Sequence, residues 1–250
     1  MGLTAHDRAV SSVEDRPMSR KLRQLAVPAA ALAGAAASAA WFRRYYLRWG
    51  ATDAEAAGAL PGDDFLPTPD LLATRAVTIK APAEAVWPWL AQMAQGRGGF
   101  YSYDFLENLL GLHIHSADRI HPEWQDIQAG DRFHLAPAAS SDLEAARVDK
   151  GSALVLRVPS DSPPGPFDFT WAFVLRPRSD GTTRLLVRER YAYRQWWTVW
   201  MVEAVEVASF VMSRRMLQGI RSRAERSAWQ ATGQGDHSAV QEACPRVGGC

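Results

Sequence analysis

The chain has 250 residues, of which 47% are apolar and 22% charged, a globular balance that allows a sizeable core. The net charge of +1 gives no global reason to expect a nucleic-acid partner. The two cysteines, Cys244 and Cys250, both lie close to the C-terminus, which excludes a disulfide framework.

Three stretches are expected to lie outside the folded domain. Residues 1–24 are polar and without apolar periodicity, and residues 230–250 are rich in Gly, Ser and Gln, so both are predicted to be disordered tails. Residues 43–70 contain several prolines and acidic residues, which predicts a linker. We therefore expect one folded domain over residues 71–229.

An uncharged segment dominated by alanine occupies residues 25–42. Basic clusters flank it, and Trp41, Phe42, Tyr45 and Tyr46 gather at one end, as interfacial residues would. A helix of roughly 27 Å would just span a bilayer core, so we predict a transmembrane helix that acts as a single-pass membrane anchor. Two alternatives stay open: a cleaved secretory signal, and the alanine-rich helix of a soluble, cytoplasmic protein.

The folded domain is predicted to open with a strand that leads directly into a helix. Residues 74–80 alternate in polarity, which indicates a strand. The helix is expected to begin near Pro82, with Val86, Leu90 and Met93 at the spacing of a buried stripe.

Short strands and one long helix are predicted over the rest of the domain. The expected elements are a short amphipathic helical segment at 100–112, strands at 132–135, 145–148, 153–158, 169–175 and 183–193, and a helix from about 198 to 229. Asp180 and Gly181 are expected to form the turn between the last two strands. The first half of the long helix is apolar almost all round, which predicts that its own domain buries it.

This order of elements predicts the α+β class. A long helix with so much apolar surface needs a curved antiparallel sheet wrapped around it. Such a sheet leaves room beside the helix, and that gap is where a small molecule would bind. The hydrophobic N-terminal helix would precede this domain.

Several segments together resemble the START-like, or SRPBCC, superfamily of polyketide cyclase/dehydrase and lipid-transport proteins, in a bacterial subgroup. They are TRAVTIKAP with AEAVWPWL, GRGGFYSYDFLENLLGL, HSADRIHPEWQDIQAGD, TWAFVLRPRSDGTTRLLVRER and FVMSRRMLQGIRSRAE. The resemblance covers roughly residues 45–228 and implies a helix-grip fold with a hydrophobic cavity between sheet and C-terminal helix. It implies no particular activity, because the superfamily includes carriers, hormone-binding proteins, cyclases and components that assist other machinery.

Large apolar side chains are the first candidates for a ligand pocket. Trp171 and Phe173 on the hairpin, with Phe210 and Met212 on the long helix, suit a greasy ligand, although they would equally suit a plain packed core. The hydroxyls of Tyr101 and Tyr103 could lie at the mouth of the pocket or could belong to surface packing.

The last strand places charges on both of its faces. Arg188 and Arg190 share one face with Leu186, and Glu189 shares the other with Val187. We expect an exposed strand end on which these charges are solvated. If Glu189 or Arg188 pointed inward, it would be a ligand-binding candidate with a perturbed pKa, because a buried charge is costly unless paired.

Other combinations of residues give weaker signals. His113 and His115 could share a metal ion if their segment were a strand, but we expect ordinary surface or hydrogen-bonding histidines and no metal. Asp104 and Glu107 lie three residues apart, which capping or solvation explains better than acid–base catalysis. The sequence shows no catalytic triad, phosphate-binding loop or cofactor motif, so no cofactor is expected.

The leading functional hypothesis is a non-catalytic module that binds or carries a hydrophobic small molecule or lipid, held at a membrane by the N-terminal helix. A second hypothesis is a polyketide cyclase- or dehydratase-like enzyme, in which polar groups in the pocket direct proton transfer. A third is an accessory protein with a filled core whose surface carries the function.

Overall fold

The computed structural model describes residues 20–109, 111, 113–136 and 142–242, and within these ranges it describes side chains from residue 28 to residue 231. The chain divides into two units, one ending at Arg43 and one beginning at Arg44. The tail residues 1–19 and 243–250 lie outside the described part. The second unit contains the whole sheet and the C-terminal helix.

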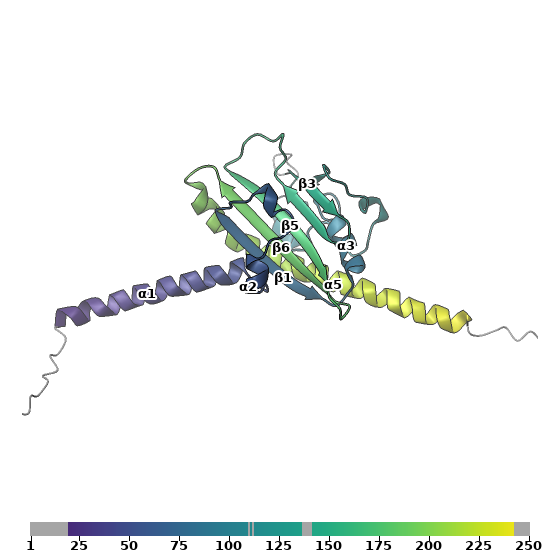
Figure 1. Cartoon of the computed structure of the whole chain (residues 1–250), viewed down its shortest axis with the longest axis horizontal. Coiled ribbons are helices and arrows are strands. Elements are labelled where there is room, and N and C mark those ends of the chain that lie inside the picture. Colours follow the sequence, from purple (N-terminus) through teal and green to yellow (C-terminus); the bar gives the residue numbers. More distant parts are fainter. Residues whose placement is uncertain (1–19, 110, 112, 137–141, 243–250) are drawn as a thin grey trace, which may run out of the picture. The chain divides into compact units, whose positions relative to one another are not determined.

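Six antiparallel strands form one open, curved sheet, and the long C-terminal helix packs on one face of it (Figure 1). Across the sheet the strands follow the order β1-β6-β5-β4-β3-β2. Their bounds are β1 Leu71–Ile79, β2 Arg132–His134, β3 Asp142–Asp149, β4 Ala153–Arg157, β5 Phe167–Pro177 and β6 Thr183–Tyr193. The predicted α+β class and the antiparallel sheet wrapped around a helix are confirmed.

Strands β5 and β6 form the central hairpin and pair along their whole length. The side chain of Asp180 accepts hydrogen bonds from the backbone N–H and the hydroxyl of Thr182 at 3.0 and 2.7 Å, and so shapes the predicted turn. Because side chains alternate along a strand, β6 sends Glu189 to the face that packs against α5 and Arg188 to the opposite face. We call these the inner face and the outer face of the sheet.

Helices α3 (Ala83–Ala91), α4 (Asp104–Leu109) and α5 (Thr198–Glu242) lie where helices were expected. The helix α5, however, does not end at residue 229 but continues through residues that we expected to be disordered. The isolated glycines Gly233 and Gly235 do not end it, since a single glycine costs a helix only about 1 kcal/mol. A 3-10 turn, η2 (Pro122–Trp124), completes this side of the domain.

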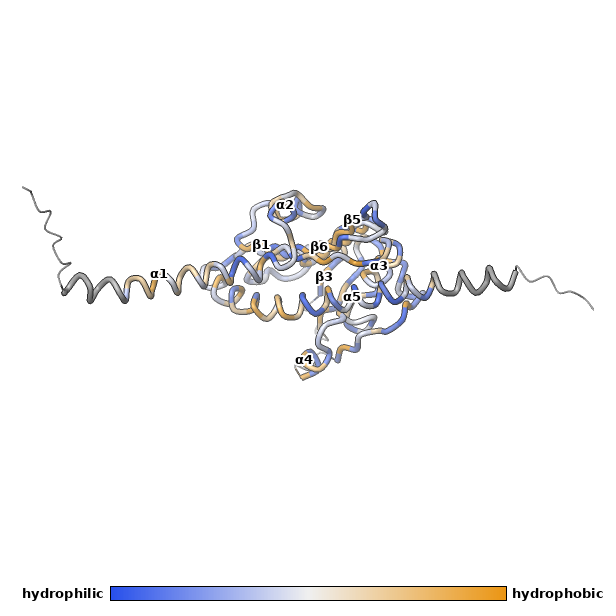
Figure 2. Tube along the Cα trace, turned by 90° about the horizontal axis from the view of Figure 1, so that it is seen from below, coloured by the Kyte–Doolittle hydropathy of each residue, from blue (hydrophilic) through white to orange (hydrophobic). Residues whose placement is uncertain are grey.

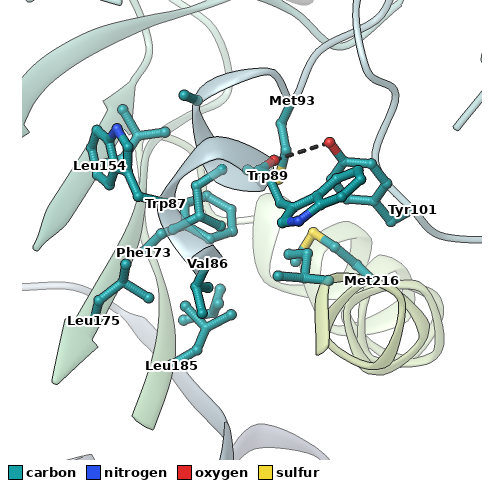
Figure 3. Close-up of a cluster of buried hydrophobic side chains, with 14 of the residues drawn as sticks. Val86, Trp87, Trp89, Met93, Tyr101, Leu154, Phe173, Leu175, Leu185 and Met216 are labelled. Carbon is teal, nitrogen blue, oxygen red and sulfur yellow. Dashed lines mark hydrogen bonds between the residues drawn. The ribbon is translucent and has the colours of Figure 1, made fainter. Parts of the chain in front are cut away.

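The hydrophobic core lies between α3, α5 and the inner face of the sheet (Figure 3). Val86, Leu90 and Met93, the predicted stripe of α3, are each 0% exposed. They belong to one buried cluster with Phe173 of β5 and Met216 of α5. The predicted buried stripe is confirmed, and it fixes α3 against the second half of α5.

The helix α5 approaches the loop before α4 very closely at Gly219. A Cβ atom at this position would overlap the backbone oxygen of Tyr101. Tyr101 has a positive φ of 57°, and its hydroxyl donates a hydrogen bond to the carbonyl oxygen of Trp89 at 3.0 Å (Figure 3). The absence of a side chain at Gly219 therefore sets how closely α5 packs against this loop.

Residues 48–67 cover the outer face of the sheet, and we call them the N-terminal strap. The strap contains α2 (Asp53–Ala57) and the 3-10 turn η1 (Asp63–Phe65). Its side chains Ala56 and Leu60 are buried, each at 5% exposure. This part of the chain thus differs from the linker that its prolines and acids predicted, because side chains of β6 bind its backbone and hold it on the sheet.

Backbone groups of other segments bind to both edge strands of the sheet, β1 and β2. At β1 the backbone N–H of Ala76 donates to the carbonyl oxygen of Trp49 at 3.1 Å, and the following Gly50 lies so close that a Cβ atom there would overlap the carbonyl of Ala76. At the other edge β2 has three residues, and the N–H of Gln95 donates to the carbonyl oxygen of His134 at 2.8 Å.

Helix α1 (Arg20–Leu47) contains the alanine-rich segment 25–42, which is helical as expected. Among the described residues, no helix of the chain combines the length and the apolar character that crossing a membrane requires. The described part of the chain therefore gives no support to the predicted transmembrane helix.

Candidate ligand-binding site

Three charged side chains meet on the inner face of the sheet and form what we call the inner charge cluster. Arg75 projects from β1, Glu189 from β6 and Glu206 from α5. Nη1 of Arg75 donates to Oε1 of Glu189 at 3.0 Å, and Nη2 donates to Oε1 of Glu206. The three side chains are 1%, 3% and 0% exposed, so the cluster is sealed from solvent.

The two carboxylates of this cluster are satisfied to different degrees. Glu189 accepts hydrogen bonds from Arg75 and from the hydroxyls of Ser209 and Ser213, each at 3.0 Å. Glu206 accepts from Arg75 through Oε1, whereas its buried Oε2 has no hydrogen-bond partner among the described residues. Buried polar atoms normally have partners, so Glu206 offers an open acceptor position between sheet and helix.

Burial sets the protonation of the cluster. It raises the pKa of Glu206 to about 7, and the negative charge of Glu189 adds to this rise while Arg75 opposes it. Burial alone would lower the pKa of Arg75, but the two carboxylates raise it, so the guanidinium stays charged. Burial and the same carboxylates raise the pKa of the nearby Tyr191 hydroxyl, which stays neutral. The pKa of Glu206 therefore lies close to neutral pH.

A row of aromatic rings continues from the cluster along the inner face. The ring centroid of Phe169 lies 4.7 Å from that of Tyr191 and 6.5 Å from that of Trp171, which lies 4.8 Å from Phe173. Trp171 stands directly opposite Glu189 in the register of β5 and β6. Phe169 and Trp171 are half-buried, so the row leads from a partly open margin of the domain to the charge cluster.

The structure brings four predicted ligand-binding residues to the inner face or beside it. Trp171, Phe173 and Glu189 project from the hairpin as described, and Phe210 of α5 is 8% exposed. The guanidinium carbon of Arg75 lies 5.7 Å from the ring centroid of Phe210. These residues share one region of the sheet–helix interface.

Three further predicted residues lie around α4 and α5, away from this cluster. The hydroxyl of Tyr101 points inward to the carbonyl oxygen of Trp89, and Tyr103 is 40% exposed. Met212 is half-buried, and its carbonyl oxygen accepts a hydrogen bond from the hydroxyl of Ser102 at 3.2 Å.

Arg188 lies on the outer face, where its guanidinium binds the N-terminal strap. It donates to the carbonyl oxygens of Glu55, Ala56 and Gly58 at 2.9, 3.0 and 2.9 Å, and to Asp63 at 2.6 Å. Burial lowers the pKa of Arg188, and the charge of Asp63 opposes this. Of the two candidates on β6, Glu189 therefore lies on the inner face and Arg188 on the outer face.

The expected solvation of the β6 charges is wrong. Arg188, Glu189 and Arg190 are 2%, 2% and 7% exposed. The physical reason is that each face of β6 is covered by another element, the strap on the outer face and α5 on the inner face, and each cover brings polar partners for the charges.

Two members of the inner charge cluster, Arg75 and Glu206, were missed as site residues. The signal for Arg75 was its place in the alternation of β1, on the same face as Val77 and Ile79. The signal for Glu206 was an acidic residue in the most apolar part of α5. Neither charged residue alone predicts a site in the sequence, because the two side chains come together only through contacts between distant segments.

A surface pocket of about 210 Å³ lies between α5 and the loop before α4, and Phe210, which borders the inner charge cluster, is also part of its lining. Its lining consists of Tyr103, Phe210, Val211, Arg214, Arg215 and Gln218. It combines an apolar wall with two basic side chains, whereas the inner site combines aromatic rings with two carboxylates and an arginine.

The remaining candidates from the sequence are a possible metal site and the pair Asp104 and Glu107. The described residues contain no group of three or more His, Cys, Asp or Glu side chains that could hold a metal ion. Asp104 accepts hydrogen bonds from the N–H and hydroxyl of Ser116 at 2.7 and 2.6 Å. The expected solvation is wrong for Glu107, which is 1% exposed and whose two carboxylate oxygens have no hydrogen-bond partner among the described residues. Burial raises its pKa to about 7, with a smaller contribution from Asp104.

Comparisons with known proteins bear on the fold alone. No family model and no curated protein matches the chain. Solved structures to which the chain is similar include a protein from Thermobifida fusca, at 16% identity over 62% of this chain and 93% of that one, with a TM-score of 0.41. A protein from Nitrosomonas europaea matches at 13% identity over 63% and 96%, with a TM-score of 0.41.

A protein of the dynemicin biosynthetic locus matches at 14% identity over 60% of this chain and 47% of that one, with a TM-score of 0.34. Likenesses this distant carry no argument about activity. The fold assignment rests on the sheet and helix of the chain itself, which have the helix-grip arrangement that the sequence resemblance implied.

Proposed function

We propose that the chain binds a mainly apolar small molecule between the inner face of the sheet and α5, with the inner charge cluster recognising its polar end. The observation that carries the proposal is the buried Oε2 of Glu206, an acceptor without a donor among the described residues, in a cluster joined to the aromatic row through Glu189 and Trp171. Replacing buried ion pairs by apolar side chains is often neutral or stabilising by about 1–4 kcal/mol. The presence of three buried charges here supports recognition of a polar group.

The chemistry of the site supports a defined class of ligand. Oε2 of Glu206 needs a hydrogen-bond donor, such as a hydroxyl or an amine, and Nε1 of Trp171 is a buried donor without a partner among the described residues. Aromatic rings favour an aromatic or hydrocarbon body. The best candidate is therefore a lipid-like or polycyclic molecule that carries a hydroxyl or amine at one end.

Identification of the natural ligand tests the proposal directly. Native mass spectrometry of the protein purified from its own cells should show a bound small molecule, and extraction should identify it as apolar with one polar end. A purified chain with no added mass and no binding of any apolar probe would contradict the proposal and favour the accessory role.

A probe pair tests the role of Glu206. Naphthol and naphthalene share an aromatic body, but naphthol alone carries a hydroxyl donor, so the wild type should bind naphthol about tenfold more tightly, by the free energy of one charge-assisted hydrogen bond. The variant Glu206→Leu should lose that preference, whereas Glu84→Leu, a change of an exposed carboxylate on α3, should keep it. Equal preference in both variants would show that Glu206 does not contact the ligand.

A cyclase-like enzyme is the second candidate, and the raised pKa of Glu206, about 7, favours it. A carboxylate of this kind can take a proton from the carbon next to a ketone and return it, as a cyclisation or dehydration requires. In deuterated water the wild type should speed deuterium incorporation at the methyl group of acetophenone, and Glu206→Gln should abolish the acceleration. Equal incorporation with and without the protein would leave binding as the function.

A further inference from the structure

The first half of α5 carries an apolar stripe that faces away from the sheet. Trp200, Ala204, Val207 and Val211 recur at the spacing of one helix face. Trp200, Val207 and Val211 are 74%, 40% and 44% exposed. The opposite side of the helix holds the buried residues of the domain, so the stripe is a second apolar face that the fold itself does not use.

Further exposed apolar side chains lie around this stripe. Trp196 and Trp197, just before the helix, are 84% and 40% exposed. On α4, Phe105 and Leu109 are 78% and 73% exposed. Figure 2 shows α4 and α5 on the same side of the sheet, with α2 on the other side. The loop before α4 contacts α5 through the bond of Ser102 to the carbonyl of Met212. We call the stripe and these residues together the apolar surface.

The fully exposed charges next to the apolar stripe of α5 are basic. The stripe runs directly into Arg214 and Arg215, which are exposed and line the surface pocket with Val211. Among the acidic residues of α4 and the first half of α5, Glu206 and Glu107 are 0% and 1% exposed, whereas Glu203 and Asp104 are half-buried. An apolar surface that is bordered by exposed cations and whose acids are buried or half-buried is complementary to a layer that is apolar inside and anionic at its boundary.

We propose that the apolar surface docks on the boundary of a lipid bilayer that contains anionic lipids, with Arg214 and Arg215 contacting phosphate groups. Tryptophan favours the boundary between head groups and acyl chains, and three tryptophans gather at the start of α5. A helix lying in this plane buries its apolar side and keeps its basic residues at the head groups. Docking would also bring the inner site next to a source of apolar ligands, an advantage that rests on the proposed function.

The shape and charge of the surface favour lipid over a second copy of the chain. Two rigid copies of the chain would have to fit projecting tryptophan side chains against one another. Each copy would also present exposed cations and no fully exposed acid along the first half of α5. A fluid lipid layer accommodates projecting rings and supplies the anions. A self-associated dimer is therefore an outcome that would overturn the proposal.

Vesicle flotation with the full chain tests the docking. The probes are vesicles of phosphatidylcholine alone and vesicles of phosphatidylcholine mixed equally with phosphatidylglycerol. The wild type should float with the mixed vesicles. The double variant Trp200→Asp/Val207→Asp should lower the partition coefficient by about a hundredfold, because two apolar side chains each lose roughly 1.5–3 kcal/mol of burial. The matched control Trp229→Asp/Gln230→Asp adds the same charge to exposed positions of the same helix and should float as the wild type does.

A second pair of variants tests the cations. Arg214→Gln/Arg215→Gln should weaken flotation with the mixed vesicles about thirtyfold, at roughly 1 kcal/mol per basic residue near an anionic surface, and should leave binding to phosphatidylcholine unchanged. Arg226→Gln, an exposed residue farther along α5, is the control. Brominated lipids should quench the tryptophan fluorescence of the wild type. The quenching should be smaller in Trp200→Phe, which lacks a docked tryptophan, and should persist in Trp229→Phe.

Three results would overturn the inference. The first is a wild type that does not float with the mixed vesicles, and the second is equal flotation of both double aspartate variants together with equal quenching of both phenylalanine variants. The third is a stable dimer that forms without vesicles and that the Trp200→Asp/Val207→Asp change dissociates. Loss of ligand binding at the inner site with normal flotation would instead count against the proposed function alone.

Discussion

Strand β6 separates two buried charge clusters that differ in how completely their groups are satisfied. On the outer face Arg188 makes five hydrogen bonds, to Thr74, to three backbone carbonyls of the strap and to Asp63. On the inner face Glu206 makes one hydrogen bond and leaves a carboxylate oxygen without a partner among the described residues.

The difference shows what each cluster does. A fully bonded arginine that binds backbone carbonyls stabilises one conformation of the segment it holds, and it offers nothing to a ligand. A cluster with an open acceptor is less stable than it could be, and such sites recur where a protein must bind or transfer a proton. We therefore infer a structural role for Arg188, and the inner charge cluster remains the candidate site.

Removal of Arg188 should have the largest effect on stability. Arg188→Ala removes one donor from Asp63, which keeps the N–H of Leu60 and the guanidinium of Arg190, and it removes the Arg188 donor from three carbonyl oxygens of the strap. Breaking a buried pair of this kind costs about 3–5 kcal/mol. Urea unfolding followed by circular dichroism measures the loss. Arg178→Ala, a change of an exposed arginine after β5, should alter stability by less than about 0.5 kcal/mol. A similar small effect for both variants would show that the strap does not depend on Arg188.

The two clusters should respond to pH in opposite directions. The pKa of Glu206 is raised from 4.5 to about 7, so its contribution to stability is present below pH 4.5 and is lost as the pH rises through 7. The hydrogen bond with Arg184 lowers the pKa of Glu55 in the strap to about 2, so its contribution is present above pH 4.5 and is lost as the pH falls through 2.

Variants separate these two contributions. Between pH 4.5 and pH 7.5 the free energy of unfolding of the wild type should fall relative to that of Glu206→Gln by up to about 3 kcal/mol, at 1.36 kcal/mol per pKa unit. Glu55→Gln should keep the wild-type slope over this range and change it below pH 4.5. Parallel curves for the wild type and Glu206→Gln would mean that Glu206 is charged throughout.

Neutralising each carboxylate of the inner cluster should show their unequal roles. Glu189→Gln weakens the bonds to Arg75, Ser209 and Ser213 and should cost about 2 kcal/mol, since bonds to charged groups contribute roughly 1.5–3 kcal/mol. At pH 7.5 Glu206→Gln should cost less, because it also removes an unsatisfied charged oxygen. Thermal unfolding at that pH compares the two, and a larger loss for Glu206→Gln would contradict the assignment.

Single hydrogen bonds give the smallest effects. Thr74→Val removes one of the bonds of Arg188 on the outer face, and Ser213→Ala removes one bond to Glu189 on the inner face. Each should lower the free energy of unfolding by about 1 kcal/mol. In the ligand assays Ser213→Ala should alter affinity and Thr74→Val should not, and the reverse result would move the binding site to the outer face.

Local patterns allowed much of the sheet and core to be predicted. Polarity alternation together with the Asp180 turn predicted β6 at the residues it occupies, and the spacing of Val86, Leu90 and Met93 predicted the buried face of α3. The hairpin side chains Trp171 and Glu189 were candidates for the same reason. In each case the signal lies within a few residues of sequence.

The strap and the complete site could not be predicted in this way. The strap has the prolines, glycines and acids of a linker, and it is ordered because arginines more than a hundred residues away bind its backbone. The inner charge cluster likewise joins β1, β6 and α5. An isolated Arg75 or Glu206 carries no sign of its partners, because the pairing exists only once the sheet has closed on the helix.

The backbone contacts at the two edge strands limit the pairing of strands between copies of this protein. The carbonyl of Trp49 occupies the middle of β1, and the short β2 ends at a bond from the Gln95 backbone. Neither edge offers a long row of free donors and acceptors that could template an incoming strand from another molecule, the route that leads to domain swapping and amyloid. The hairpin strands β5 and β6 lie in the interior of the sheet, between β1 and β4, where their backbone groups are already paired on both sides.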